Sequence, residues 1–248
     1  MDGEAAQLKK RLTELANRAD ARGCYTNTEF LTLAEQDLLL HLPQSGAPVR
    51  LDGGYDGAER KVAIFGSEAL CGYVQDAHIV CVSIRPVAQK FADALTHRDF
   101  LGALMSLGIR RELLGDILLH ENCGYLFCLE SISAYIIEQL TQVRHSTVRC
   151  EISDLPPICT DPPPQQSVNV ASERLDAILA AVYHLSRSDS QRYFGQEKVF
   201  LNSRLTLSAA ASPKPGDIVS VRGLGRFRYD GIEQTTRKGR LRVFVRKY

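Results

Sequence analysis

Apolar side chains near the start of the chain recur at the interval of a helix that buries one face. This pattern predicts a helix over residues 4–22. The residues of its apolar stripe are Leu8, Leu12, Leu15 and Ala19. A second helix is expected over residues 28–42, because Thr28 is a suitable N-cap for the stripe that follows. The apolar run at residues 62–65 follows a glycine-rich turn and predicts a buried strand. We therefore expect residues 1–75 to form a first domain that is helical or α+β.

The pattern then changes to an alternation of strands and helices within residues 76–154. β-Branched and aromatic residues gather in the predicted strands, and apolar residues follow a helical stripe in the predicted helices. The predicted strands are residues 79–84, 124–130 and 146–152. The predicted helices are residues 97–107 and 131–140, with a short helical turn at 110–116. The order β-α-β-α-β indicates a small α+β sandwich as the second domain.

Five prolines in residues 155–169 predict a linker, which we place at residues 155–170. After it, an apolar stripe predicts a helix over residues 173–185. Ser186 is a good N-cap for the next helix, and Gly195 can end that helix in the left-handed conformation. Short strands follow, so residues 171–248 should form a third domain of two helices and a small antiparallel sheet. The whole chain is thus expected to be an α+β protein.

Charge is distributed unevenly along the chain, although the net charge is only +1. Residues 1–173 contain 15 Lys and Arg against 23 Asp and Glu, which gives −8. Residues 174–248 contain 15 Lys and Arg against 6 Asp and Glu, which gives +9. A basic end on a more acidic body is typical of proteins that bind nucleic acid.

Other features of the sequence argue against export and against a metal site. No apolar run approaches the ~20 residues of a membrane span, and the start lacks an apolar signal segment, so we expect a cytoplasmic location and no membrane partner. The seven cysteines are odd in number and form no CxxC pair, so neither a disulfide framework nor a zinc site is expected. We expect no metal and no cofactor.

The C-terminal residues resemble the S4 RNA-binding domain. The residues that carry this resemblance are Arg174-Leu175-Asp176, Ser186-Arg187, Gly195, Val199, Asn202 and Pro215-Gly216-Asp217. Ser203 departs from the pattern, because glycine usually follows the asparagine. Nearly the whole chain, including HRDFLGALMSLGIRRELLGDI at residues 97–117, is similar to the YlmH family of bacterial RNA-binding proteins. That resemblance implies an RNA-recognition-motif-like middle domain, association with the large ribosomal subunit, and rescue of stalled nascent chains bearing peptidyl-tRNA.

Phosphate binding requires an array of cations, since each neutralised phosphate releases counterions. The RNA-binding residues expected in the third domain are Arg174, Ser186, Arg187, Arg192, Lys198, Asn202, Arg204, Lys214, Arg222, Arg226 and Arg228. A second RNA contact in the middle domain would consist of Arg85, Arg98, Arg110 and Arg111, unless these residues pair with neighbouring carboxylates. The arginines of residues 237–248 are expected to contact RNA, to protect a strand edge, or to do both.

Our first hypothesis is a non-catalytic protein that binds structured rRNA or tRNA. The sequence does not determine its oligomeric state, and a monomer is favoured. We expect no catalytic residues, because no P-loop, HExxH or nucleophile-elbow motif is present. The second hypothesis is an RNA-modifying enzyme of the pseudouridine synthase or methyltransferase type that uses the basic module for targeting. Asp176 would then be considered as a nucleophile, although its place at a helix start favours a structural role. The third hypothesis is an adaptor whose acidic half binds a protein.

Overall fold

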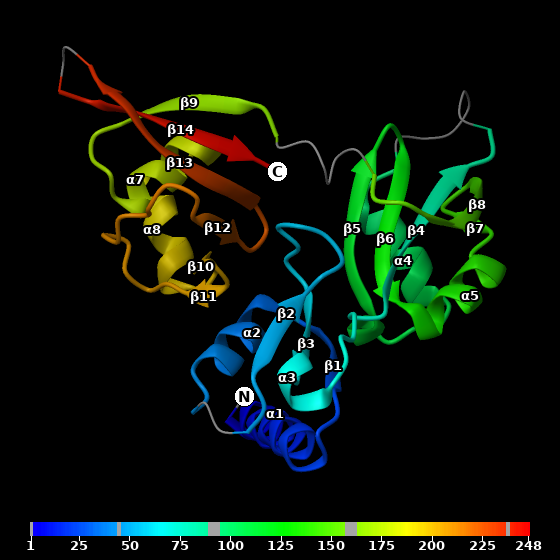
Figure 1. Ribbon diagram of the computed structural model, residues 1–248. Helices are drawn as coiled ribbons and strands as arrows, with labels where there is room; N and C mark the ends of the chain where they lie inside the picture. Colours follow the sequence, from blue (N-terminus) through cyan, green and yellow to red (C-terminus); the bar gives the residue numbers. More distant parts are fainter. Residues whose placement is uncertain (1, 44–45, 89–94, 157–162, 237–238) are drawn as a thin grey trace. The chain divides into compact units, whose positions relative to one another are not determined.

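A computed structural model describes all residues except 1, 44–45, 89–94, 157–162 and 237–238. Backbone contacts divide the chain into two compact units, Met1–Thr160 and Asp161–Tyr248 (Figure 1). This division falls inside the segment predicted as a linker, of which residues 157–162, with Cys159, lie outside the described part. None of the described helices combines the length and the apolarity needed to cross a bilayer.

The first unit begins with a long helix that packs on a small antiparallel sheet. Helix α1 (Asp2–Arg22) buries Leu12, Ala16 and Ala19, which pack in one cluster with Phe65. The sheet order is β1-β3-β2, with β1 (Thr26–Leu31), β2 (Val49–Asp52) and β3 (Lys61–Phe65). Helix α2 (Leu33–Leu40) follows β1, and the short helix α3 (Glu68–Cys71) follows β3.

The prediction of a helix over residues 28–42 is wrong in its first half. Thr28 is not an N-cap: its side chain is buried in β1, where Oγ1 accepts a hydrogen bond from the Ala63 amide at 2.9 Å. Thr32 caps the helix instead. Its hydroxyl accepts from the Glu35 amide at 3.4 Å, and the Glu35 carboxylate accepts from the Thr32 amide at 2.6 Å. Because Thr32 forms this reciprocal capping box, the helix begins at Leu33, after strand β1 has ended.

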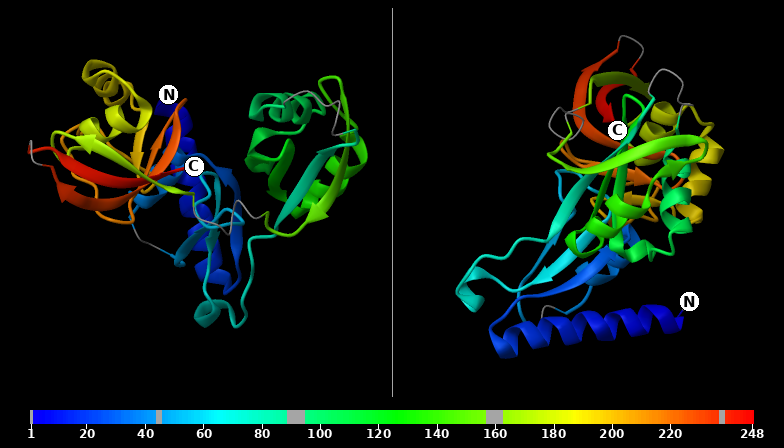
Figure 2. Two further views of the ribbon diagram at one scale, coloured as in Figure 1. Left: turned by 90° about the horizontal axis from the view of Figure 1, so that it is seen from above. Right: turned by 90° about the vertical axis from the view of Figure 1, so that its right-hand side faces the viewer.

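The remainder of the first unit is a five-stranded antiparallel sheet in the order β5-β6-β4-β8-β7. The strands are β4 (Ile79–Pro86), β5 (Leu114–His120), β6 (Cys123–Leu129), β7 (Gln142–Val143) and β8 (Ser146–Ser153). Helices α4 (His97–Ser106) and α5 (Glu130–Gln139) lie together on one side of it (Figure 2). The order β4-α4-β5-β6-α5-β8 is the split β-α-β arrangement expected of an RNA-recognition-motif-like fold.

The prediction for residues 110–116 is wrong in part. Only Arg111–Leu113 is helical, as the 3-10 turn η2, and Leu114 begins strand β5. Gly115 is buried in this strand, where a Cβ atom would lie 2.7 Å from the Phe30 ring. Close contact with β1 and pairing with β6 therefore decide the conformation, and neither is visible in the local spacing of apolar residues.

The second unit has two helices against a six-stranded antiparallel sheet (Figure 1). The helices are α7 (Leu175–Tyr183) and α8 (Arg187–Gly195). The sheet order is β11-β10-β12-β13-β14-β9. Its strands are β9 (Gln165–Val170), β10 (Val199–Leu201), β11 (Arg204–Leu205), β12 (Ile218–Val221), β13 (Gly225–Thr235) and β14 (Leu241–Lys247).

Two predictions for this unit require correction. The linker does not extend to residue 170, because Gln165–Val170 forms β9 and pairs along β14. Gly195 does not end α8 in the left-handed conformation. The positive φ falls on Glu197, at 56°, while the Gln196 and Lys198 amides donate to the Arg192 and Tyr193 carbonyls. The N-cap role of Ser186 is confirmed, since its hydroxyl accepts from the Asp189 amide at 3.1 Å.

Candidate nucleic-acid interface

Side chains at the start of helix α8 already cap its first turn. Ser186 donates to the Asp189 carboxylate at 2.6 Å while accepting from the Asp189 amide. A carboxylate in the first turn satisfies the positive end of the helix dipole. A phosphate at this end would therefore compete with Asp189. The structure thus favours the exposed arginine side chains of α8 over its backbone amides as phosphate ligands.

Asp176 organises the side chains between α7 and α8. Its fully buried carboxylate accepts two hydrogen bonds from Arg174, from Nε and from Nη2, each at 2.9 Å. Arg187 approaches the same carboxylate at 3.9 Å, and Gln191 donates to it at 3.4 Å. The hydrogen bonds from Arg174 hold the pKa of Asp176 below its usual range, although burial opposes this effect. Arg174 is therefore engaged in a fixed ion pair, whereas Arg187 keeps 71% of its side chain exposed.

Four of the predicted cations lie on the helix side of the second unit, and we call Arg187, Arg192, Lys198 and Arg204 the α8 face. Arg192 is 71% exposed and pairs with Asp189 at 3.5 Å. The Lys198 ammonium lies 5.9 Å from the centre of the Tyr193 ring, at the end of α8. Arg204 is exposed on the edge strand β11, opposite Leu201, whose side chain packs with the helices.

Asn202 has a structural role in the turn between β10 and β11. Both Asn202 and Ser203 adopt positive φ, at 51° and 67°, which is the geometry of a type I′ hairpin turn. The Asn202 side chain donates to Asp217 at 2.8 Å and accepts from the Ile218 amide at 2.9 Å. Because both the nitrogen and the oxygen of its side-chain amide are hydrogen-bonded within the protein, we leave Asn202 out of the proposed RNA contact. Lys214 is exposed beside it.

The remaining predicted residues lie on the other face of the sheet. Arg226 and Arg228 alternate along β13 with residues that pack against the helices, so they point away from the α8 face. Arg226 is only 7% exposed, and its guanidinium lies 4.6 Å from the centre of the Tyr248 ring. Arg228 pairs with Asp230 at 2.7 Å. The Arg222 guanidinium lies 5.4 Å from the Phe200 ring on this second face.

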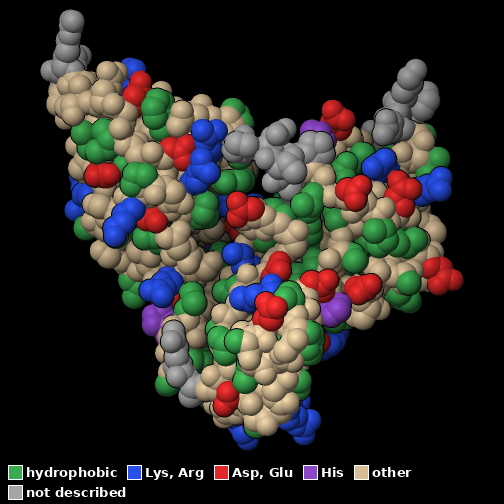
Figure 3. Space-filling model, viewed as in Figure 1, with side chains coloured by type: hydrophobic (Ala, Val, Ile, Leu, Met, Phe, Trp, Pro, Cys, Tyr) green, Lys and Arg blue, Asp and Glu red, His purple; other side chains and the backbone are tan. Residues whose placement is uncertain are grey.

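The predicted cations are therefore not gathered on one platform. Lys and Arg side chains alternate with Asp and Glu over the visible surface of the second unit (Figure 3). Burial removes Arg226 from the proposed contact, and the ion pair with Asp230 weakens the case for Arg228. The α8 face remains as the group with the most exposed arginines.

The four residues of the predicted second RNA contact differ in their environments in the structure. Arg110 pairs with Glu29, and Arg111 donates to the Leu114 and Gly115 carbonyls at 2.7 and 3.1 Å. Burial lowers the pKa of Arg111 to about 10, with Arg60 as the second cause. Arg110 joins the first sheet to the middle part of the unit, and Arg111 fixes the start of β5, so we assign both residues a structural role. Arg98 is exposed on α4, and Arg85 is exposed on β4.

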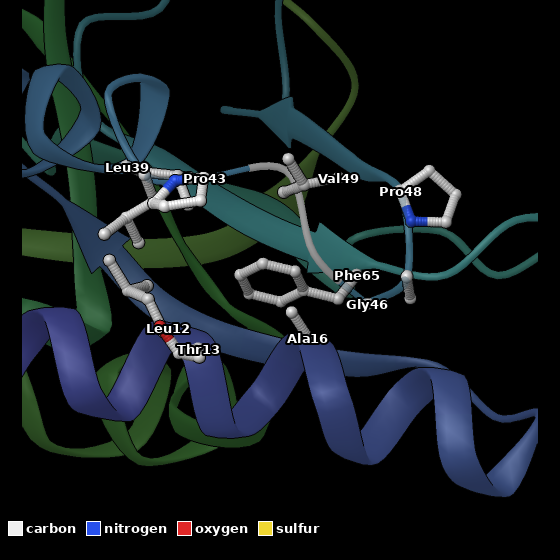
Figure 4. Close-up of a pocket in the computed structure, with 11 residues that line it drawn as sticks. Leu12, Thr13, Ala16, Leu39, Pro43, Gly46, Pro48, Val49 and Phe65 are labelled. Atoms are coloured by element: carbon white, nitrogen blue, oxygen red, sulfur yellow. The ribbon is translucent and has the colours of Figure 1, made fainter.

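A pocket of about 390 Å³ lies in the first unit between α1, α2 and the start of β2 (Figure 4). Leu12 and Ala16 contribute from α1, Leu39 from α2 and Phe65 from β3. Of the described residues that line it, Thr13 alone has a polar side chain. Such a lining offers neither the cations that phosphate requires nor the convergent polar groups of an active site.

Comparison with known proteins identifies the family. Residues 73–156 match the family model described as "Putative RNA-binding domain in YlmH". Over 220 residues the chain is 33% identical to the "Ribosome-associated protein quality control protein P2" of Bacillus subtilis (strain 168), covering 87% of this chain and 84% of that protein. The chain belongs to the YlmH family.

A solved structure agrees with this assignment at the level of the fold. The "Cell division protein ylmH from Streptococcus pneumoniae" aligns with a TM-score of 0.50 and 20% identity, over 61% of this chain and 92% of that one. The match to the YlmH family model coincides with β4 through β8, so the expected α+β fold of this part of the chain is confirmed. Residues 1–75, which we predicted as a separate domain, belong to the same compact unit.

Sequence reasoning missed one aromatic contact in this YlmH family member. Tyr55, in the turn between β2 and β3, packs on Phe127 of β6, with ring centres 4.6 Å apart. Its hydroxyl donates to Asp116 at 2.8 Å, and the same carboxylate accepts from the Glu59 and Arg60 amides. The glycine-rich turn was the available signal, because Gly54 leaves room for this packing. A Cβ atom there would lie 2.8 Å from Phe127.

Proposed function

We propose that this chain is a non-catalytic RNA-binding protein that binds structured rRNA or tRNA on the large ribosomal subunit, in the quality control of stalled translation. The observation that carries the proposal is the α8 face, with Arg187 and Arg192 each 71% exposed on one helix. The net charge of +9 in residues 174–248 provides the long-range attraction. The name of the Bacillus subtilis relative supports a ribosomal partner, which the chain would meet in the cytoplasm.

Arginine is suited to this contact because its planar guanidinium can hold two phosphate oxygens at once. The acidic neighbours of Arg187 and Arg192 leave most of each side chain in solvent. Double-stranded RNA is recognised mainly through phosphates and 2′-hydroxyls rather than base edges. A rigid helix that displays arginines therefore fits a structured RNA better than it fits a specific base sequence.

The environment of Asp176 favours a binding role over RNA modification. A nucleophilic aspartate must reach its substrate, but the Asp176 side chain is fully buried and held by Arg174. The single site that the enzyme hypothesis named is thus used to fix α7 against α8.

Co-sedimentation with purified ribosomal subunits tests this proposal. The chain should pellet with the large subunit, and Arg187→Glu/Arg192→Glu should lose most of this binding. Lys9→Glu, a charge reversal of an exposed residue on α1, is the control and should bind as the unaltered chain does. Equal binding by the double variant would remove the α8 face from the interface. Binding to a ribosomal protein that survives digestion of the RNA would favour the adaptor hypothesis instead.

A further inference from the structure

The five-stranded sheet of the first unit has one face that its helices leave uncovered. Val82 and Ile84 of β4 point toward α4 and α5, where they are completely buried in the main cluster of this part. Side chains alternate along a strand, so the intervening residues point to the opposite face. These residues are Cys81, Ser83 and Arg85 on β4, Cys123, Tyr125 and Phe127 on β6, and Arg149 and Glu151 on β8.

One end of this uncovered face is closed by the chain itself. Tyr55 packs on Phe127 with an angle of 31° between the rings, and Phe127 is 1% exposed. Gly54, with φ 86°, brings the turn close enough for this contact. Tyr125 is also buried, at 8%. A nucleic-acid base therefore finds no free aromatic ring on which to stack at either position.

The other end of the face carries cations. Arg85 and Arg149 lie directly opposite each other on β4 and β8, and both are exposed. Ile84 is opposite Gly124, and His120 is opposite Cys123, so His120 and Arg85 flank Cys123 in the same row across the sheet. Burial raises the pKa of the Cys123 thiol, and Arg85 is close enough to oppose this rise, whereas Glu121 adds to it. Glu121 lies 3.9 Å from His120 and is the acidic neighbour of this end of the sheet.

Two arginines in a directly opposed cross-strand pair repel each other. Glu151 compensates only Arg85, at 3.7 Å, and both side chains are about half exposed, at 46% and 50%. An ion pair in that setting is weak. Arg149 has no ion pair within the part of the chain that the structure describes. An anion that bridges Arg85 and Arg149 would relieve their repulsion.

We infer that this end of the sheet, formed by Arg85 and Arg149 with His120 beside them, binds the phosphodiester backbone of RNA without reading its bases. The class of ligand rests on the proposed function, whereas the site is separate from the α8 face and lies in the other unit. Because Tyr55 of the same chain packs on Phe127, RNA recognition on this sheet is restricted to the charged end. Arg85 is thus the member of the predicted second group that keeps an RNA-binding role.

Equilibrium binding of the full chain to short oligo(U) and oligo(A) probes tests the inference. Arg149→Gln should lower affinity roughly threefold to tenfold on both probes, and should reduce the slope of log affinity against log salt by about 0.7. Arg98→Gln is the matched control and should leave affinity and slope unchanged. Arg98 is exposed on α4, which packs on the opposite face of the sheet from Arg85 and Arg149, so this site does not include it. Glu151→Gln should raise affinity, because it releases Arg85 from its carboxylate.

The site is overturned if Arg149→Gln binds both probes as the unaltered chain does, or if Arg98→Gln lowers affinity equally. Loss of affinity for only one probe would overturn recognition by phosphate alone. Arg187→Gln/Arg192→Gln separates this site from the proposed function. If that variant keeps its affinity for a structured rRNA hairpin while Arg149→Gln loses affinity for both probes, the α8 face fails and the sheet site stands. If only the α8 variant loses affinity, the sheet site fails and the proposed function stands.

Discussion

Arg174 donates two hydrogen bonds to Asp176, one from Nε and one from Nη2, and the accepting carboxylate is completely buried. The backbone of Asp176 adds two further contacts, because its amide donates to the Ala209 carbonyl and its carbonyl accepts from Ser190 at 2.7 Å. One residue therefore connects α7, α8 and the loop before β12. Asp176, which the enzyme hypothesis considered as a nucleophile, thus holds the helix that carries the α8 face.

Replacing Asp176 with Asn should destabilise the second unit, since Arg174 would lose its charged partner and the buried acceptor would be weaker. We expect the Tm of this unit to fall by roughly 5 °C or more. Thermal unfolding followed by circular dichroism measures this. The control is Glu197→Gln, which removes the charge of an exposed carboxylate just after α8. An unchanged Tm for Asp176→Asn would show that the ion pair with Arg174 contributes nothing to stability.

Acid should destabilise the second unit through the same residue. The hydrogen bonds from Arg174 are the main cause that holds the pKa of Asp176 below its ordinary value of 3.8. Burial alone would raise the pKa of Asp230, but the hydrogen bonds from Arg228 and Arg246 outweigh burial, so this pKa is also lowered. A lowered carboxyl pKa contributes stability that is fully present above the ordinary value and is lost as pH falls through the folded value. Tm should therefore be level above about pH 5 and decline below pH 4. Asp176→Asn should show a shallower decline, and an identical pH profile would contradict the assignment.

Removal of the α8 cap should have a moderate effect on stability. Ser186→Ala leaves the Asp189 amide without its side-chain acceptor, and loss of an N-cap costs about 1 kcal/mol. Urea unfolding of the second unit measures the change. Ser208→Ala, an exposed serine in the loop after β11, serves as the control and should be close to neutral. Equal effects of the two substitutions would mean that the cap is not formed in solution.

The contact between Gly54 and Phe127 can be separated from backbone strain. Gly54 and Gly57 both have positive φ, at 86° and 81°, so alanine is strained at either position. Only at Gly54 would the added Cβ meet Ile79 and Phe127, each at 2.8 Å, whereas nothing lies within 4 Å at Gly57. Gly54→Ala should therefore destabilise the first unit more than Gly57→Ala in urea unfolding. Equal destabilisation would argue that the turn does not pack on the sheet.

The sequence predicted the helices with clear apolar stripes, α4, α5 and α7, and the strands with continuous apolar runs. The predictions from sequence failed where pairing with a strand distant in the sequence decides the local conformation. Strand β9 has few large apolar residues, and its conformation depends on β14, whose sequence lies 71 or more positions later. In the candidate site, the sequence placed Arg187 and Arg192 on one helix after the N-cap Ser186, as part of the expected array of cations. The engagement of Arg174 and the burial of Arg226 depend on partners in space, and residue spacing does not reveal these partners.

The central claim is that the exposed arginines of α8 meet RNA phosphates. The most direct measurement is the slope of log affinity against log salt for a structured rRNA hairpin, comparing the full chain with Arg187→Gln/Arg192→Gln. If each arginine neutralises one phosphate, the slope of the variant should be smaller by about 1.8, and its affinity at low salt should also be lower. Equal slopes for the two proteins would contradict the claim.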